Sequence, residues 1–115
     1  MDNSVESAVN AGSLVSSGAE EDVLSLVQRA KKGDLSAFDS LIVRYRQRLY
    51  SVIYNMTMNA EDAADLSQES FVKAFRSLAK FQEKSSFYTW LYRIGVNLTL
   101  THLKKRKIRQ FFSFD

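Results

Sequence analysis

The chain has 115 residues and a formal net charge of +3, with no cysteine and no proline. This length fits one domain with a modest core, and the missing cysteines exclude disulfides and thiolate metal ligands. No apolar run is long enough to cross a bilayer, and the first residues lack the pattern of a signal peptide. We therefore expect a protein of the cytoplasm.

The first twenty residues differ in composition from the rest. Residues 1–20 are rich in Ser, Ala, Asn and Gly and show no apolar periodicity, which is typical of a disordered leader. A helical domain is expected over residues 21–110, and residues 111–115 would begin a linker. Because proline is absent and only 4 glycines occur, helices are favoured nearly throughout this domain.

Two helices are predicted in the first half of the domain. The first runs from Glu21 to Lys32 and stops at Gly33, which tolerates the left-handed conformation after a helix; its stripe is Val23, Leu24, Val27 and Ala30. The second begins near Asp34 or Ser36 and runs to about Thr57. Apolar residues recur along it every three or four positions, at Phe38, Leu41, Ile42, Tyr45, Leu49, Val52, Ile53 and Met56.

Two more helices follow. Asn59 is the expected N-cap of the third, whose inner face is Ala63, Leu66, Ser70, Phe71, Ala74, Phe75 and Leu78. After a break at residues 82–86, Ser85 or Ser86 caps a fourth helix from Phe87 to about Arg109, with an inner face of Phe87, Trp90, Leu91, Ile94, Leu98 and Thr101. No segment alternates as a strand does. The fold class is therefore all-α, a compact bundle of about four helices.

Charge is separated into two poles along the sequence. Residues 59–69 carry acids without a base, and residues 101–110 carry Lys104, Lys105, Arg106, Lys107 and Arg109 without an acid. Such poles indicate two kinds of partner. The helix dipole explains Glu61 and Asp62, but its effect fades after the first turn. The ridge of Asp65, Gln68 and Glu69 is therefore predicted to dock a basic or polar partner.

Aromatic residues gather just before the basic run, at Phe81, Phe87, Tyr88, Trp90 and Tyr92. Rings stack on exposed bases and cations hold phosphates, so this combination indicates single-stranded nucleic acid. Composition by itself favours another interpretation, a core helix with a solvated basic end.

No catalytic, cofactor or metal site is predicted. His102 is the only histidine and has no carboxylate neighbour in sequence. Glu61, Asp62, Asp65 and Glu69 could suggest a metal site, but no histidine joins them and a favourable helix start explains the first acids. A glycine-rich phosphate loop is also missing. We expect a binding protein, not an enzyme.

Three segments together resemble region two of bacterial extracytoplasmic-function (ECF) sigma factors. They are residues 65–78 (DLSQESFVKAFRSL), Phe81, and residues 86–97 (SFYTWLYRIGVN). Residues 27–41 (VQRAKKGDLSAFDSL) resemble the segment that opens the same domain. The resemblance covers about residues 21–107, in order and with the expected spacing.

The resemblance implies a promoter-recognition role with two surfaces. In the family, the D-x-x-Q-E segment docks on a coiled coil of the largest subunit of core RNA polymerase; here it is Asp65, Gln68 and Glu69, within Asp65 to Leu78. The loop before the fourth helix reads the promoter −10 element and captures a base flipped from the non-template strand. This site would comprise Phe81, Gln82, Glu83, Lys84, Ser85, Ser86 and Asn97. Phosphates would be held by Arg93, Lys104, Lys105, Arg106 and Lys107.

Two departures from the family pattern bear on these expectations. The loop lacks the glycine often found there, and Glu83 places an acid in a DNA-facing segment. Full sigma factors of this class also carry a second helical domain for the −35 element, so the chain is expected to be truncated; the alternative is a natural protein with this single domain. An anti-sigma protein is a further expected partner. The rival hypothesis is a helical protein-interaction adaptor whose basic tail is solvated or touches acidic lipid.

Overall fold

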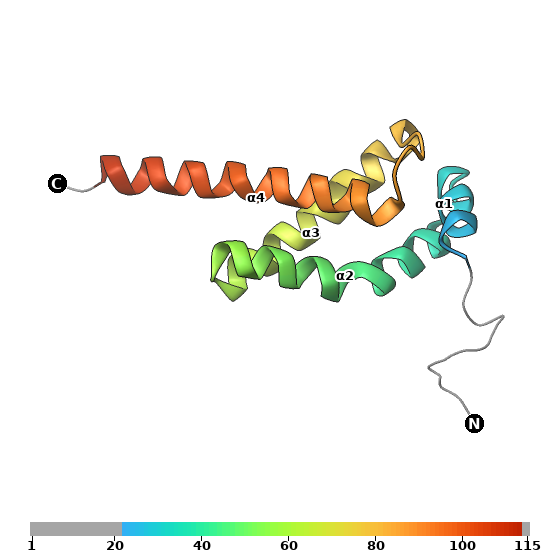
Figure 1. The fold of residues 1–115 in the computed structure, drawn as a ribbon, viewed down its shortest axis with the longest axis horizontal. Helices are drawn as coiled ribbons and strands as arrows, with labels where there is room; N and C mark the ends of the chain where they lie inside the picture. The colour runs from blue at the N-terminus through green and yellow to red at the C-terminus, as the bar shows by residue number, and fades with distance from the viewer. Residues whose placement is uncertain (1–21, 114–115) are drawn as a thin grey trace, which may run out of the picture. The chain divides into compact units, whose positions relative to one another are not determined.

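The computed structural model describes residues 22–113 (Figure 1). The predicted leader at residues 1–20 lies outside the described residues, as do residues 114 and 115. The regular secondary structure of residues 22–113 is α-helical apart from one 3₁₀ turn, and the predicted all-α class of four helices is confirmed. The elements are α1 (Val23–Lys31), α2 (Leu35–Thr57), α3 (Ala60–Ser77), the 3₁₀ turn η1 (Leu78–Lys80) and α4 (Phe87–Phe112).

The chain divides into two compact units after Ala37. In the first unit, α1 buries Leu26, Val27 and Ala30, whereas Leu24 is 52% exposed. The predicted stripe was therefore wrong at Leu24. Leu24 and Leu26 are both spaced so that they could join a helical stripe with later apolar residues. The structure buries Leu26, which lies beside Val27 and Ala30 on the helix.

The turn between α1 and α2 is organised by Asp34. Its Oδ1 accepts hydrogen bonds from the Ser36 amide at 3.1 Å and the Ser36 hydroxyl at 2.7 Å. Its Oδ2 accepts from the Arg29 guanidinium at 3.0 and 2.8 Å. Gly33 just before it takes φ +99°, which glycine adopts readily. The two groups, Ser36 first and then Arg29, lower the pKa of Asp34 to about 2.

The second unit is built around a close approach of three helices at Gly95 of α4. A Cβ atom at this position would lie 3.0 Å from Leu49 Cδ1 of α2 and 3.3 Å from Ser70 Oγ of α3. The side chains around it are fully buried: Leu49, Ile53, Ser70, Leu91 and Thr99 are each 0% exposed. Only glycine leaves room for this contact, so Gly95 determines how closely α4 packs.

The buried face of α4 differs in part from the predicted one. Phe87 and Leu91 are buried as expected, but the stripe continues through Gly95 and Thr99, and Thr101 is exposed. The Thr99 hydroxyl donates to the Gly95 carbonyl at 2.7 Å, so its polar atom is satisfied in the core. A search for apolar residues alone passes over both positions, because neither glycine nor threonine stands out as hydrophobic.

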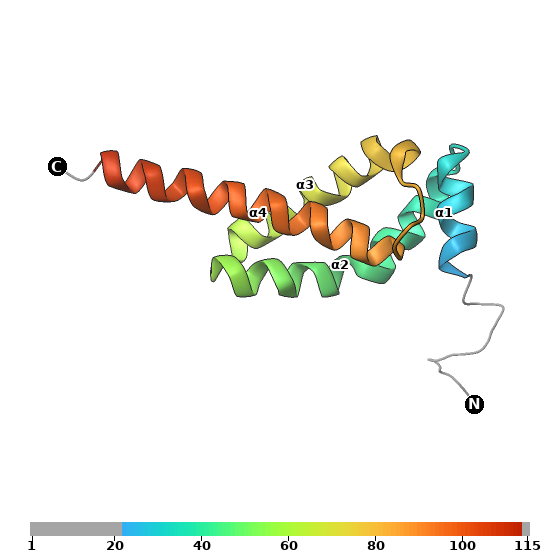
Figure 2. The ribbon, with the colours of Figure 1, turned by 45° about the horizontal axis from the view of Figure 1, so that its top comes forward.

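The N-caps of α3 and α4 are residues that were predicted from the sequence. The Asn59 side chain accepts from the Asp62 amide at 2.9 Å, as predicted. Of the two candidate serines, Ser86 caps α4, with its Oγ accepting from the Thr89 amide at 3.1 Å. The helix α4 continues to Phe112, three residues past the expected end, so residues 111 and 112 of the expected linker are helical. Figure 2 shows α4 extending beyond the ends of α2 and α3.

We expect Gly95→Ala to destabilise the fold. The added methyl group would lie 3.0 Å from Leu49 Cδ1 and 3.3 Å from Ser70 Oγ, so these fully buried side chains would have to shift. Overpacking costs about 1–3 kcal/mol, and the better helix propensity of alanine offsets about 1 kcal/mol. A net loss of up to about 2 kcal/mol should be seen in urea denaturation. The exposed substitution Asn55→Ala is the control and should stay within about 0.5 kcal/mol; equal midpoints for the two variants would contradict the packing argument.

Asp34 should make the fold sensitive to acid. Its pKa is lower in the folded chain than in the unfolded one, so its charged form stabilises the fold above a pH of about 4. That contribution is lost as the pH falls through the folded pKa of about 2. An NMR titration of the carboxyl carbon should give a midpoint near this value. Ser36→Ala should raise the midpoint, whereas Ser51→Ala should not, and a midpoint near 3.8 in the parent would refute the cap.

Candidate interaction surfaces

The acidic ridge of Asp65, Gln68 and Glu69 lies on the solvent side of α3. All three residues are exposed, while Leu66 and Ser70 beside them face the core. Their spacing of three and four places them on one helical face. Within residues 22–113, neither Asp65 nor Glu69 forms an ion pair. The ridge is therefore accessible to a partner with basic or hydrogen-bonding groups.

Asp62 is not part of this ridge. Its Oδ2 lies 3.2 Å from Nε2 of His102 and 3.8 Å from Nη1 of Arg106, both on α4. Sequence reasoning found no carboxylate near His102, because the contact joins residues forty positions apart. Through these two contacts, Asp62 connects the start of α3 to the C-terminal half of α4. Among residues 22–113, no group of three or more acidic or histidine side chains is arranged to hold a metal ion.

Phe81 is a core residue in this structure. Its side chain is only 4% exposed, and its ring centroid lies 4.8 Å from that of Trp90 and 6.1 Å from that of Phe87. The ring has no free face on which a base could stack. The expected stacking role therefore does not fit the structure, and we assign Phe81 to anchoring the start of the loop against α4.

The loop that follows Phe81 is exposed at Gln82, Glu83 and Lys84. Glu83 takes φ +61°, a left-handed conformation that glycine adopts at no steric cost. The loop therefore lacks the glycine often found in the family, but Glu83 adopts the left-handed backbone conformation that glycine favours. Ser86 is exposed, but its hydroxyl serves the helix cap and contacts Thr89 Oγ1 at 2.9 Å. The Ser86 Oγ atom is therefore already hydrogen-bonded to Thr89 of α4.

Asn97 is exposed on α4 and shares a face with Trp90. Seven residues separate the two, which is about 20° around the helix and about 10 Å along its axis. Since Phe81 packs on Trp90, the loop begins on the same face that presents the Asn97 amide. Arg93 is also exposed and lies one turn before Asn97. The fold thus brings the loop anchor, one amide and one cation to a common side of α4.

Tyr88 is covered by a neighbour that the sequence did not reveal. The Arg48 guanidinium lies 3.9 Å from its ring centroid, a cation–π contact, and Tyr45 lies 5.3 Å away. Burial raises the pKa of the Tyr88 phenol above its ordinary value, while Arg48 opposes the rise. The phenol is therefore protonated at neutral pH. Of the five rings in the aromatic cluster named from the sequence, only Tyr92 is exposed, at 41%.

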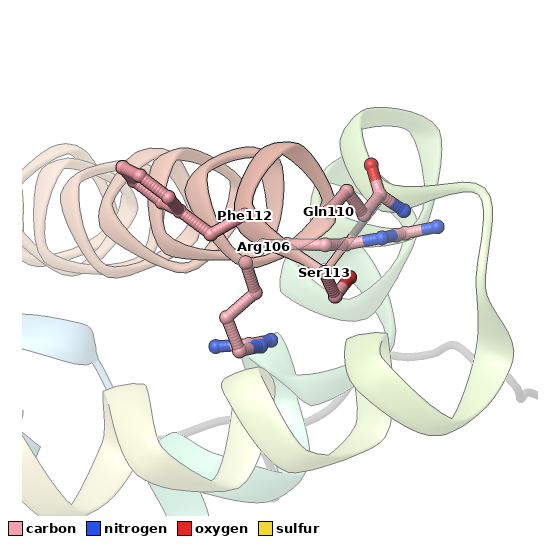
Figure 3. Close-up of a pocket in the computed structure, with 5 residues that line it drawn as sticks. Arg106, Gln110, Phe112 and Ser113 are labelled. Carbon is pink, nitrogen blue, oxygen red and sulfur yellow. The ribbon is translucent and has the colours of Figure 1, made fainter. Parts of the chain in front are cut away.

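The basic end of α4 presents cations on several sides. Lys104, Lys105 and Lys107 are exposed, and Arg106 is half-buried. Figure 3 shows the Arg106 and Phe112 side chains leaving the helix in different directions. An open hollow of ≈590 Å³ there is lined by Arg106, Arg109, Gln110, Phe112 and Ser113. Two guanidinium groups with an amide and a hydroxyl suit a phosphate. Arg109 is an addition to the predicted set, and its spacing of three from Arg106 was the available signal.

Over residues 22–113, we find no helix whose length and apolar character would allow it to span a membrane.

The sequence matches the model of the Sigma-70 region 2 family over residues 41–108. This span is more than half of the chain, and the chain belongs to that family. It is 41% identical over 87 residues to the RNA polymerase sigma-H factor of Pseudomonas aeruginosa, covering 76% of this chain and 45% of that protein. It is 45% identical over 78 residues to the ECF RNA polymerase sigma-E factor of Escherichia coli K12, covering 68% and 40%.

A third relative is the ECF RNA polymerase sigma factor SigW of Bacillus subtilis, which is 37% identical over 81 residues, covering 70% of this chain and 43% of that protein. The chain thus spans less than half the length of these curated relatives. Its fold is similar to an engineered region 2 of sigmaE solved by NMR in complex with GTAAAA, with a TM-score of 0.72 and 39% identity. That match covers 81% of this chain and 96% of the other.

Proposed function

We propose that this chain is the part of an ECF-type sigma factor that binds core RNA polymerase and recognises and helps melt the promoter −10 element. The observation that carries the proposal is the similarity, in fold and at 39% identity, to a sigmaE region 2 solved with GTAAAA. Exposure of the ridge, the loop and Asn97 supports it. The protein would act in the cytoplasm by binding, without catalysis of its own.

The ridge on α3 would supply the polymerase contact. Asp65 and Glu69 offer carboxylates to basic side chains, and Gln68 adds an amide that both donates and accepts. Because Leu66 and Ser70 fix the opposite face of the helix in the core, the three side chains are presented on a rigid support. We further infer that an anti-sigma protein would regulate the factor by covering such a surface.

The loop and Asn97 would receive one unstacked base of the non-template strand. An amide can donate to and accept from a base edge, and flipped bases are read by such hydrogen bonds. Glu83 is suited to accept from the amine of a cytosine. Arg93 and the exposed lysines at 104, 105 and 107 would hold phosphates, which position the strand without reading its sequence.

Replacing Gln68 and Glu69 together by alanine should weaken binding to core polymerase. Both side chains are exposed, so the helical content and the unfolding midpoint should change little, by under about 0.5 kcal/mol. Binding to single-stranded DNA should stay at the level of the parent. Co-purification of the double variant with polymerase at the parent's yield would refute the docking role of the ridge.

Asn97→Ala should remove base preference at one position of a −10 oligonucleotide. Loss of the hydrogen-bonding partner should cost about 1–3 kcal/mol of discrimination there, while preferences at the other positions remain. The measurement is a titration of single-stranded oligonucleotides permuted at each position, starting from GTAAAA. Asn55→Ala, an exposed asparagine on α2, is the matched control. If the Asn97 variant keeps the parent's full preference, base capture at this site is excluded.

A further inference from the structure

A second polar site lies between α2 and α3, next to the acidic ridge. It is a pocket of ≈390 Å³ lined by Arg46, Gln47, Tyr50, Ala64 and Ser67. A guanidinium, an amide, a phenol and a hydroxyl thus surround one hollow, and every one of these groups can donate a hydrogen bond. Within the described residues, Arg46 forms no ion pair that would neutralise it.

Ser67 adds a buried polar group to the wall of this pocket. Its side chain is 9% exposed, and its hydroxyl is buried without a hydrogen-bond partner among the described residues. The other three buried hydroxyls among residues 22–113 have partners: Ser70 donates to the Leu66 carbonyl and Thr99 to the Gly95 carbonyl, each at 2.7 Å, and Thr57 donates to the Asn59 carbonyl at 3.2 Å. Buried polar groups are almost always paired. A buried hydroxyl left unpaired at a pocket wall is therefore suited to an incoming polar group.

The charges around the pocket select the kind of occupant. A set of donors centred on a guanidinium suits a carboxylate, which accepts two hydrogen bonds from arginine at once. Phosphate would suit the same donors. However, Asp65 and Glu69 lie on the adjoining face of α3, and these acids repel the densely charged backbone of a nucleic acid. A single carboxylate on a protein partner carries only one negative charge and meets much less of this repulsion.

The pocket and the ridge form one continuous surface, since Ala64 and Ser67 of the pocket alternate along α3 with Asp65 and Gln68 of the ridge. We propose that the Arg46–Ser67 pocket binds an aspartate or glutamate side chain of the same partner that docks on the ridge. This inference rests on the proposed function, in which that partner is core RNA polymerase. The partner surface would carry basic groups opposite the ridge and one acid opposite Arg46, which sets the register of docking.

The test is a fluorescence titration of bacterial core RNA polymerase with the full chain and four single variants. Arg46→Gln and Ser67→Ala should each weaken binding about tenfold, because each loses a hydrogen bond to a charged group. Ser67→Ala should leave the thermal unfolding midpoint unchanged or raise it, since it removes an unpaired polar atom. The matched controls Arg44→Gln and Ser51→Ala lie on α2 outside the pocket and should bind as the parent does.

A double variant and a nucleic-acid arm complete the test. If Arg46 and Ser67 hold one carboxylate, combining their substitutions should weaken binding by less than the product of the single effects. Affinity for the GTAAAA oligonucleotide should not change. Equal losses for polymerase and oligonucleotide in Arg46→Gln would assign the pocket to phosphate and overturn the proposal, as would an equal loss in Arg44→Gln.

The failure of this inference can be separated from failure of the proposed function. If the parent binds polymerase and the Gln68 and Glu69 double variant does not, while Arg46→Gln binds as the parent does, only the pocket is refuted. If the parent does not bind polymerase at all, the proposed function and the pocket fall together.

Discussion

The arrangement of the second unit depends on the missing side chain at Gly95. Leu49 and Ile53 of α2 and Ser70 of α3 come within 3.0 to 3.6 Å of the place where a Cβ atom would be, so three helices meet at one residue of α4. Close packing of this kind leaves little freedom for sliding or rotation, because interiors have few voids. The angular setting of each helix, and therefore the direction in which its outer residues point, follows from this contact.

The positions of both proposed binding surfaces, the ridge on α3 and the loop with Asn97 on α4, are set by the packing of this core. On α3, the burial of Leu66 and Ser70 turns Asp65, Gln68 and Glu69 outward. On α4, the buried stripe through Leu91, Gly95 and Thr99 leaves Asn97 and Arg93 on the exposed side. The Phe81–Trp90 contact then fixes where the loop joins α4. Rigid supports of this kind keep the cost of ordering low when a partner binds.

Much of this arrangement could be predicted from sequence, and the exceptions share a physical cause. Helix boundaries, the Asn59 and Ser86 caps and the exposed ridge all arise from local chemistry, which a sequence displays directly. The missed features depend on contacts between distant residues. Gly95 and Thr99 are buried because another helix approaches them, and Asp62 meets His102 across forty positions. Phe81 was expected to face a base, yet a ring flanked by Phe87 and Trp90 gains more from mutual burial.

The outer part of α4 differs from the rest of the bundle in what holds it together. After Thr99, no side chain in residues 100–113 is fully buried, and only His102, Leu103 and Arg106 are half-buried. These turns of helix therefore rely mainly on intrinsic propensity, on this partial burial and on the contacts of Asp62. Like charges also face each other there, at Lys104 and Lys107 and at Lys105 and Arg109, and such spacings oppose helix formation. An anionic ligand would relieve this repulsion. If the phosphate contacts proposed for this segment form, they would stabilise the helix as well as the complex, and part of the heat measured on titration would then come from the helix instead of the contact itself.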